Sequence, residues 1–201
     1  MKVFKNEVFR LVMIWVWIFI SVSACAMGTE MDNSLVGSEP PGLVAKPGES
    51  KVTKLIRLNQ WAIRAKASSQ YGSQNWAAFQ ATGEPNTLQC GDQPTAWASK
   101  NPNSGIEWIE LNYSYPVWVE EINIHETLNP GGVAKVEVKK ADGTYSTVWE
   151  GYDPTRVCPG TLKIIVNNPV LTGTIRVILD TTRVSGWDEI DAIELVGEGS
   201  Q

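Results

Sequence analysis

Residues 106–126 read IEWIELNYSYPVWVEEINIHE, and apolar side chains alternate with polar ones along most of this stretch. Such a period of two indicates half-buried β-strands. In the first half, Ile109 and Leu111 fall on one face and Glu110 on the other. Residues 117–126 repeat the pattern, and the two consecutive glutamates within them mark an expected change of register. The stretch therefore predicts two strands, each with one buried face.

The same alternation recurs on both sides of this stretch, with turn residues between the segments. Further strands are predicted at residues 61–66, 133–139, 145–150, 162–166, 174–180 and 190–196, with residues 51–58 as a first strand or a lead-in. Residues 75–82 predict only a weak helical turn, and residues 141–144 (Ala-Asp-Gly-Thr) predict a hairpin turn. Short strands at this spacing, without a long helix, are typical of an all-β sandwich or jelly roll, here of about eight strands.

Composition and charge exclude two classes of protein. The 201 residues are 43% hydrophobic and 19% charged, which is enough apolar material for a core and excludes wholesale disorder. The formal net charge is −5, and Lys and Arg form no cluster. Nucleic-acid binding is therefore excluded, because it needs Lys and Arg to neutralise phosphates.

The first 24 residues have the features of a secretory signal peptide. Lys2, Lys5 and Arg10 precede or flank the start of an uninterrupted apolar run over residues 11–20, which is too short for a transmembrane helix. The following Val22-Ser23-Ala24-Cys25 resembles a bacterial lipobox. This resemblance implies cleavage before Cys25 and attachment of acyl chains, such as palmitate, to that residue. The alternative is an ordinary signal peptide followed by a chance cysteine.

Residues 25–50 are the expected tether between the lipid bilayer and a globular domain over residues 51–201. They are rich in Gly, Ser, Pro, Glu and Asp and lack periodicity, and Glu39-Pro40-Pro41-Gly42 is the clearest break. In the resembled signals, an aspartate after the lipidated cysteine retains the protein at the inner membrane. Ala26 stands there. The expected location is thus the cell envelope, lipid-anchored, and the outer membrane if the host has one.

Two cysteines remain in the predicted domain, Cys90 and Cys158. An even pair in an exported protein favours a disulfide. Two buried free thiols are the alternative. A metal site built on the pair is disfavoured, because His125 is the single histidine and no C-x-x-C spacing occurs.

Several short segments of the predicted domain, taken in order, resemble one protein family. They are residues 67–72 (ASSQYG), 76–86 (WAAFQATGEPN), 96–98 (AWA), 107–111 (EWIEL), 126–131 (ETLNPG), 148–151 (VWEG) and 186–195 (GWDEIDAIEL). Together they resemble the scarf domain of pappalysin-type proteins and of bacterial surface proteins. That domain is similar to the discoidin and coagulation-factor C-type modules, so the resemblance implies a galactose-binding-like jelly-roll β-sandwich. No H-E-x-x-H motif accompanies it, so proteolysis is not implied.

The resemblance also implies a structural Ca²⁺ ion between a loop after the first strands and the last strand. Here the loop lies within residues 80–86, and the strand at residues 190–196 offers Asp191 and Glu194 as oxygen ligands. The usual last-strand acid of the family falls near Ala192, which departs from the pattern. In a regular strand, Glu194 shares a row with apolar residues. The Glu194 carboxylate then lies at the solvent-exposed end of the strand or beside a backbone amide, an arginine or a cation.

Loops at one end of the sandwich are the candidates for ligand binding. Jelly rolls of the resembled class hold ligands there, and aromatic faces beside amides and carboxylates suit sugar rings and their hydroxyls. The candidate residues are Tyr71, Asn75, Trp76, Asn129, Trp187 and Asp188, of which Trp187 is favoured. This mixture favours a neutral polyhydroxy ligand over a charged polymer.

The predicted function is that of a non-catalytic binding module on the cell envelope, for a cell-surface glycan or polysaccharide. A protein–protein interaction or adhesion module of an envelope complex is the alternative. An enzyme is disfavoured, because His125 lies mid-strand between Ile124 and Glu126, and no nucleophile motif or phosphate loop occurs.

Overall fold

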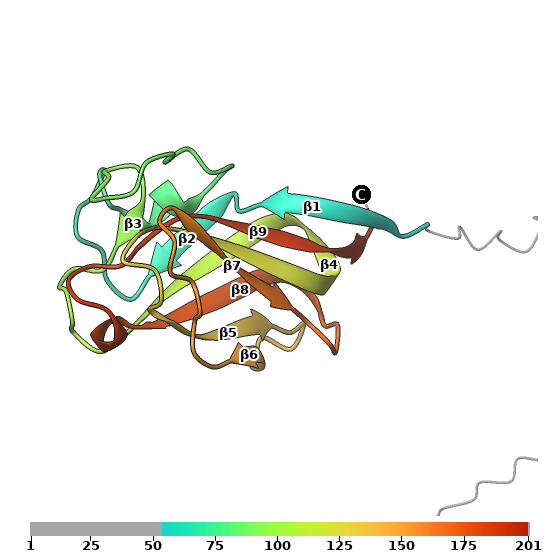
Figure 1. Cartoon of the computed structure of the whole chain (residues 1–201). Coiled ribbons are helices and arrows are strands. Elements are labelled where there is room, and N and C mark those ends of the chain that lie inside the picture. Colours follow the sequence, from blue (N-terminus) through green and yellow to red (C-terminus); the bar gives the residue numbers. More distant parts are fainter. Residues whose placement is uncertain (1–53, 201) are drawn as a thin grey trace, which may run out of the picture. The chain divides into compact units, whose positions relative to one another are not determined.

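A computed structural model describes residues 54–200, which form nine strands arranged as a β-sandwich (Figure 1). The predicted signal peptide (residues 1–24), the predicted tether (residues 25–50) and Cys25 lie outside the described residues. Residues 54–200 contain two short 3₁₀-helices, η1 (Ala78–Ala81) and η2 (Thr181–Arg183). None of the helices in this part is long and apolar enough to cross a membrane.

The strands lie close to where the alternation predicts them. Their bounds are β1 Ile56–Trp61, β2 Arg64–Ala67, β3 Trp97–Ala98, β4 Ile106–Leu128, β5 Val133–Lys139, β6 Tyr145–Glu150, β7 Gly160–Ile165, β8 Leu171–Asp180 and β9 Glu189–Gly199. The predictions for β5 and β6 are confirmed at both ends, and η1 lies within the predicted helical turn. Strand β3 has two residues, which is too short to produce a pattern in the sequence.

The two predicted central strands form one continuous strand, β4. Pro116 lies at its middle and has no N–H to donate, and the pairing with β8 shifts between Asn112 and Val117. The predicted change of register at the two glutamates is confirmed, since the pairing with β9 shifts between Val119 and Glu121. These irregularities let β4 pass from one layer of the sandwich into the other.

The two halves of β4 connect the two layers. The first half pairs with β2 and β8, and β8 continues to β5 and β6. The second half pairs with β7 and β9, and β9 continues to β1 and β3. At the bend, a Cβ atom on Gly197 of β9 would lie 2.2 Å from the Trp118 carbonyl oxygen. Only glycine allows so close an approach of the two backbones.

The core lies between the two layers and is apolar. Its largest fully buried side chains are Trp97, Ile109, Leu111, Ile122, Ile124, Ile164, Ile175, Leu179, Ile190, Ile193 and Leu195. The indole N–H of Trp97 donates to the Ser69 carbonyl at 3.1 Å, so the polar atom of this buried ring has a partner.

The structure corrects the predicted face of the last strand. Asp191 is an extra residue in β9, and the pairing with β4 skips it. Because an extra residue reverses the alternation, Ile190 lies in the same core cluster as Ile193 and Leu195. Glu194 is half-buried instead and accepts hydrogen bonds from two asparagine side chains. The prediction that Glu194 and Ile190 share one apolar row is therefore wrong.

Strand β9 runs from one end of the sandwich to the other. It begins at Glu189, and its last residue, Gly199, pairs with Ile56 at the start of β1. The chain therefore enters and leaves the described domain at the same end (Figure 1). The loops that precede β3 and β9 lie at the opposite end.

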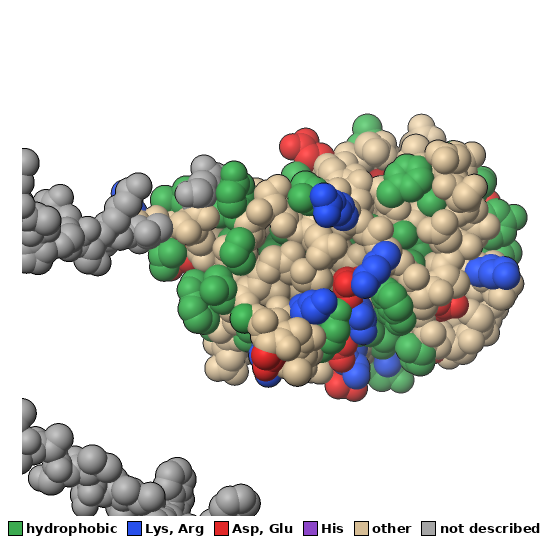
Figure 2. Space-filling view, turned by 180° about the vertical axis from the view of Figure 1, so that it is seen from behind, with side chains coloured by type: hydrophobic (Ala, Val, Ile, Leu, Met, Phe, Trp, Pro, Cys, Tyr) green, Lys and Arg blue, Asp and Glu red, His purple; other side chains and the backbone are tan. Residues whose placement is uncertain are grey.

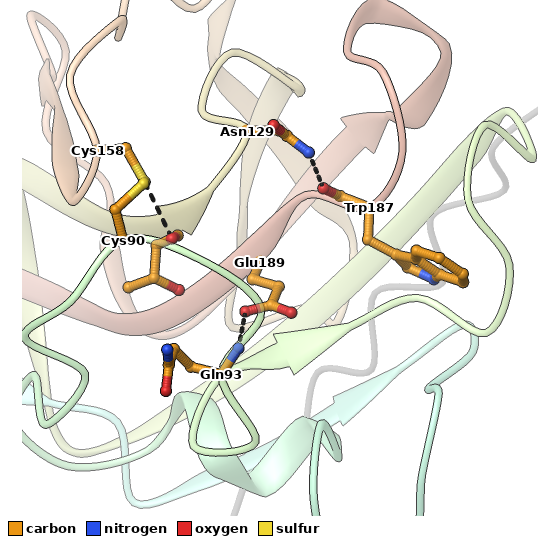
Figure 3. Close-up of a disulfide and its surroundings, with 7 residues drawn as sticks. Cys90, Gln93, Asn129, Cys158, Trp187 and Glu189 are labelled. Carbon is orange, nitrogen blue, oxygen red and sulfur yellow. Dashed lines mark hydrogen bonds between the residues drawn. A yellow bond between two sulfur atoms is a disulfide. The ribbon is translucent and has the colours of Figure 1, made fainter.

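The predicted disulfide between Cys90 and Cys158 is confirmed, with an S–S distance of 2.09 Å. It joins the segment before β3 to the segment between β6 and β7, and the two cysteines are 68 residues apart (Figure 3). Next to it, the Gly91 N–H donates to the Thr127 carbonyl at 2.9 Å. The segment before β3 is thus fixed to β4 and to the β6–β7 segment.

Charged side chains on the sandwich surface occur mostly as neighbours of opposite sign. On the face shown in Figure 2, Lys and Arg side chains lie among Asp and Glu side chains and form no continuous basic patch. One such group surrounds the buried Glu110, whose carboxylate is 2.9 Å from Lys66 Nζ and 2.7 Å from Arg176 Nη2. This surface agrees with the exclusion of nucleic acid as a ligand.

Candidate ligand-binding site

The loops at the end of the sandwich opposite the chain entry form a pocket of about 100 Å³. The residues that line it come from the segment before β3, from β3, from the end of β4 and from the start of β9. They are Tyr71, Trp76, Asp92, Ala98, Leu128, Trp187 and Glu189. Three aromatic rings and two carboxylates thus face one small hollow.

The three aromatic rings pack edge to face. The ring centroid of Tyr71 lies 5.4 Å from that of Trp76 and 5.7 Å from that of Trp187, with interplanar angles of 80° and 83°. Such perpendicular pairs are a favourable arrangement of aromatic rings and hold each ring in place. Tyr71 remains 56% exposed, so a ligand reaches the rings from solvent.

Backbone contacts fix the three rings from both sides of the pocket. The Tyr71 N–H donates to Ala98 O at 2.9 Å, and the Trp76 N–H donates to Pro94 O at 3.1 Å. Trp76 also has a φ of 53°, a left-handed conformation that is unusual for a residue other than glycine. The Trp187 indole N–H donates to Ser99 O at 3.1 Å. The left-handed backbone at Trp76 is locally strained, and strain of this kind is common at binding sites.

Two acids that the sequence does not single out complete the pocket. Asp92 Oδ1 accepts a 2.8 Å hydrogen bond from the Trp76 indole N–H. Glu189 Oε2 accepts one of 3.1 Å from the Gln93 N–H (Figure 3), and only 2% of the residue is exposed. Burial and the neighbouring Asp92 raise the pKa of Glu189 to about 8. At neutral pH, Glu189 therefore keeps its proton beside the Asp92 carboxyl.

The structure brings together only some of the predicted ligand residues. Tyr71, Trp76 and Trp187 share the pocket, as described. Asn75 is exposed next to Trp76 and does not line it. Asn129 supports the pocket from behind, since its amide donates to Ser185 O at 2.9 Å and to Trp187 O at 2.8 Å (Figure 3).

Asp188 points away from the pocket, which corrects its prediction as a ligand residue. Successive residues of an extended segment point to opposite sides, so Glu189 faces the pocket and Asp188 faces the interior. Asp188 is 2% exposed. Its Oδ2 approaches Gly132 so closely that a Cβ atom added to this glycine would lie 1.9 Å from that oxygen. The same alternation was the one signal in the sequence that would have separated Asp188 from Glu189. Asp92 gave no such signal, because its loop has no regular period.

Asp188 lies instead in a buried group of carboxyls with Glu126 and Asp153. Glu126 Oε1 accepts from the Gly131 N–H at 3.2 Å, and Asp153 Oδ1 accepts from the Thr155 N–H at 2.8 Å. Their other oxygens, and both of Asp188, find no donor among the described residues. Burial, together with the charge of Asp153, raises the pKa of Glu126 to about 9, and burial raises that of Asp188 to about 6. Glu126 is therefore a neutral acid at pH 7, able to donate to Asp153.

The residues predicted for calcium are occupied by other partners. Asp191 contacts the loop that was predicted for calcium, and it accepts hydrogen bonds from that loop. Its Oδ2 accepts from the Asn86 and Thr87 N–H groups at 3.1 Å, and its Oδ1 accepts from the Thr87 hydroxyl at 2.8 Å. Glu194 accepts from the amides of Asn59 and Asn123. Among residues 54–200, no three His, Cys, Asp or Glu side chains are grouped so that they could hold a metal ion. The Ca²⁺ ion stays a prediction.

His125 makes structural contacts. Its Nδ1 lies 3.1 Å from the Thr161 hydroxyl, and its ring centroid lies 5.6 Å from that of Trp61. Burial lowers the pKa of His125, so the ring is neutral at pH 7. The neutral imidazole therefore packs against Trp61 and lies beside the Thr161 hydroxyl on the surface of the sheet.

Comparison with protein families gives one match that covers most of the chain. The family model described as "Pappalysin-1, SD scarf domain, C-terminal" matches residues 50–201. No curated protein sequence matches the chain.

Solved structures with the same architecture include modules of bacteria and of fish. Chitosan-binding module 1 of a chitosanase/glucanase from Paenibacillus sp. IK-5 is 20% identical, over 67% of this chain and 94% of that chain, with a TM-score of 0.53. The family 32 carbohydrate-binding module of C. perfringens NanJ, in complex with galactose, is 18% identical over 69% and 99%, with a TM-score of 0.51. A fucolectin from striped bass (Morone saxatilis) serum is 16% identical over 68% and 49%, with a TM-score of 0.52. The predicted galactose-binding-like jelly roll is therefore confirmed as the fold.

Proposed function

The chain belongs to the pappalysin-1 SD scarf domain family through residues 50–201, and from this premise we propose that it is a non-catalytic module that binds a cell-surface glycan. The observation that carries the proposal is the pocket at the loop end, where Tyr71, Trp76 and Trp187 surround two carboxyls. Aromatic faces stack on the apolar faces of sugar rings, and carboxyls accept hydrogen bonds from sugar hydroxyls. Modules of the same fold that bind chitosan or hold galactose support this function.

Truncation of Trp187 is expected to weaken glycan binding by about fivefold or more. The indole lines the pocket and packs against Tyr71, and loss of a well-packed aromatic contact costs roughly 1–3 kcal/mol. A glycan microarray first identifies the tightest ligand of the parent, and calorimetry then compares the parent with Trp187→Ala. Trp118→Ala is the matched control, because this exposed tryptophan lies at the bend of β4, away from the pocket.

Two results would contradict the glycan proposal. One is equal affinity of the parent, Trp187→Ala and Trp76→Ala, provided that both variants are folded. The other is failure of every arrayed glycan to bind, which would favour the protein–protein contact module that the sequence offers as the alternative. His125→Ala is expected to bind like the parent, since His125 lies outside the pocket.

We further propose that the domain is held at the cell envelope by acyl chains on Cys25. The support is the sequence alone, namely the apolar run and the Val22-Ser23-Ala24-Cys25 tetrapeptide. Cys25→Ser is expected to move the protein from the membrane fraction to the soluble fraction of the expressing bacterium. An alkyne analogue of palmitate should label the parent and not the variant. Unchanged membrane partitioning of Cys25→Ser would overturn lipidation at Cys25.

A further inference from the structure

Resting on the proposed glycan function, we infer that the glycan carries a protonated amine, that is, a deacetylated amino sugar whose ammonium group enters the pocket. The sequence favours a neutral ligand, because it reveals the aromatic residues and not the two acids beside them. The structure places Asp92 and Glu189 in the same hollow as the three rings. The combination of rings and unpaired acids changes the expected charge of the ligand.

The three aromatic residues line one pocket and can offer ring faces to a cation. Tyr71 lies between Trp76 and Trp187 at centroid distances of 5.4 Å and 5.7 Å, and both interplanar angles exceed 75°. Rings set at right angles present faces and edges toward a common space, and ring faces attract ammonium groups within about 6 Å. The hollow of about 100 Å³ suits an amino group with its neighbouring carbons better than it suits a whole buried oligosaccharide.

The two pocket acids have no ion-pair partner in the described domain. Each carboxyl accepts one hydrogen bond from the protein, Asp92 from Trp76 and Glu189 from the Gln93 backbone. The ion pairs found within residues 54–200 involve neither acid. Both carboxyls line the pocket, and an ammonium group has three N–H donors to offer them. Hydrogen bonds between ammonium and carboxylate groups are stronger than those from a neutral hydroxyl.

The proton held by Glu189 gives the interaction a measurable signature. Glu189 keeps its proton near neutral pH because it is buried beside Asp92. An ammonium group that enters between the two carboxyls favours the ionised form of Glu189, so the proton leaves to solvent as the ligand binds. A neutral sugar provides no charge to replace that proton and leaves it in place.

The experiment compares glucosamine hexasaccharide with N-acetylglucosamine hexasaccharide at pH 6, where the free amines are protonated. We expect the parent to bind the deacetylated oligomer about tenfold more tightly or better, since cation–π contacts and two charge-assisted hydrogen bonds act together. Calorimetry in two buffers of different ionisation enthalpy is expected to detect close to one proton released per site for the deacetylated oligomer only.

Three variants decide whether the pocket acids cause the preference. Glu189→Gln is expected to reduce the preference about tenfold and to abolish proton release. Asp92→Asn, at an exposed position, tests the same pair if Glu189→Gln does not fold. Glu198→Gln is the matched control, because it removes the same charge from an exposed position on the same strand outside the pocket. It is expected to retain the full preference.

The outcomes separate this inference from the proposed function. Equal binding of both oligomers, or a preference of the parent for neutral glycans that depends on Trp187, overturns the amine and leaves the glycan function standing. A preference retained in both Glu189→Gln and Asp92→Asn overturns the role of the acids. Absence of binding to either oligomer and to every arrayed glycan overturns both proposals.

Discussion

Replacing Cys90 and Cys158 together by serine is expected to lower the free energy of unfolding by about 4 kcal/mol. The disulfide closes a loop between cysteines that are 68 residues apart, and a cross-link of this span removes much of the entropy of the unfolded chain. Denaturation of the parent and of the Cys90→Ser/Cys158→Ser variant, followed by tryptophan fluorescence, measures the difference. An unchanged denaturation midpoint would contradict the expectation.

The same variant is expected to bind its glycan more weakly than the parent, even where it is fully folded. Cys90 is two residues from Asp92 and three from Gln93, both of which shape the pocket. Without the bridge, this segment loses its connection to the β6–β7 segment. The parent treated with a reductant is the matched control and is expected to show both losses without any substitution.

Glu126→Gln is expected to remove about half of the dependence of stability on pH between about 4.5 and 9. In the folded protein the pKa of Glu126 is raised from 4.5 to about 9, so the folded state binds a proton that the unfolded state releases in this range. The contribution of Glu126 to stability is then greatest below pH 4.5 and falls by roughly 1.4 kcal/mol for each pH unit until pH 9. A glutamine has no proton to lose and still offers an N–H donor to Asp153.

Thermal denaturation of both proteins from pH 4.5 to pH 9.5 tests this prediction. The variant is expected to have the higher melting temperature at pH 9 and a shallower slope throughout. A residual slope remains, because the pKa values of Asp188 and Glu189 are also raised, to about 6 and about 8. The Arg156 side chain does not donate to these carboxyls, since its Nη1 donates to the backbone carbonyls of Asp153 and Thr155. Equal slopes for the parent and the variant would show that Glu126 is ionised in the fold.

Local pattern was sufficient to predict most of the fold. Strand β5 has buried valines along its length, and the turn at residues 141–144 has suitable residues, so the bounds of β5 and of its return strand β6 follow from the sequence. The continuity of β4 through Pro116 does not follow, because the bend depends on two layers that form only in the fold. The extra residue at Asp191 could not be predicted for the same reason, since only the pairing of β9 with β4 reveals it.

The candidate site was predictable where side-chain type alone signals a role. Tyr71, Trp76 and Trp187 are large aromatics in loop segments, and the structure brings the three together. Asp92 and Glu189 are 97 positions apart in the sequence, and nothing local shows that they face each other. Such acids become recognisable only through the fold, because their meaning depends on what lies next to them and on their burial.

The course of β9 separates the pocket from the end at which the chain enters the domain, and this bears on how several copies could bind one polymer. Its eleven residues lead from Glu189 in the pocket to Gly199 beside Ile56, a distance of roughly 35 Å for an extended strand. In each copy, the pocket would therefore lie at the end of the domain farthest from the residues before β1. A polysaccharide with a repeating sugar would meet many pockets at once, and such multivalent binding exceeds single-site affinity by roughly 10²–10⁴. With weak individual sites of this kind, avidity rises with the density of the protein on the surface. The polymer stays bound as a whole, while its single contacts continue to break and re-form.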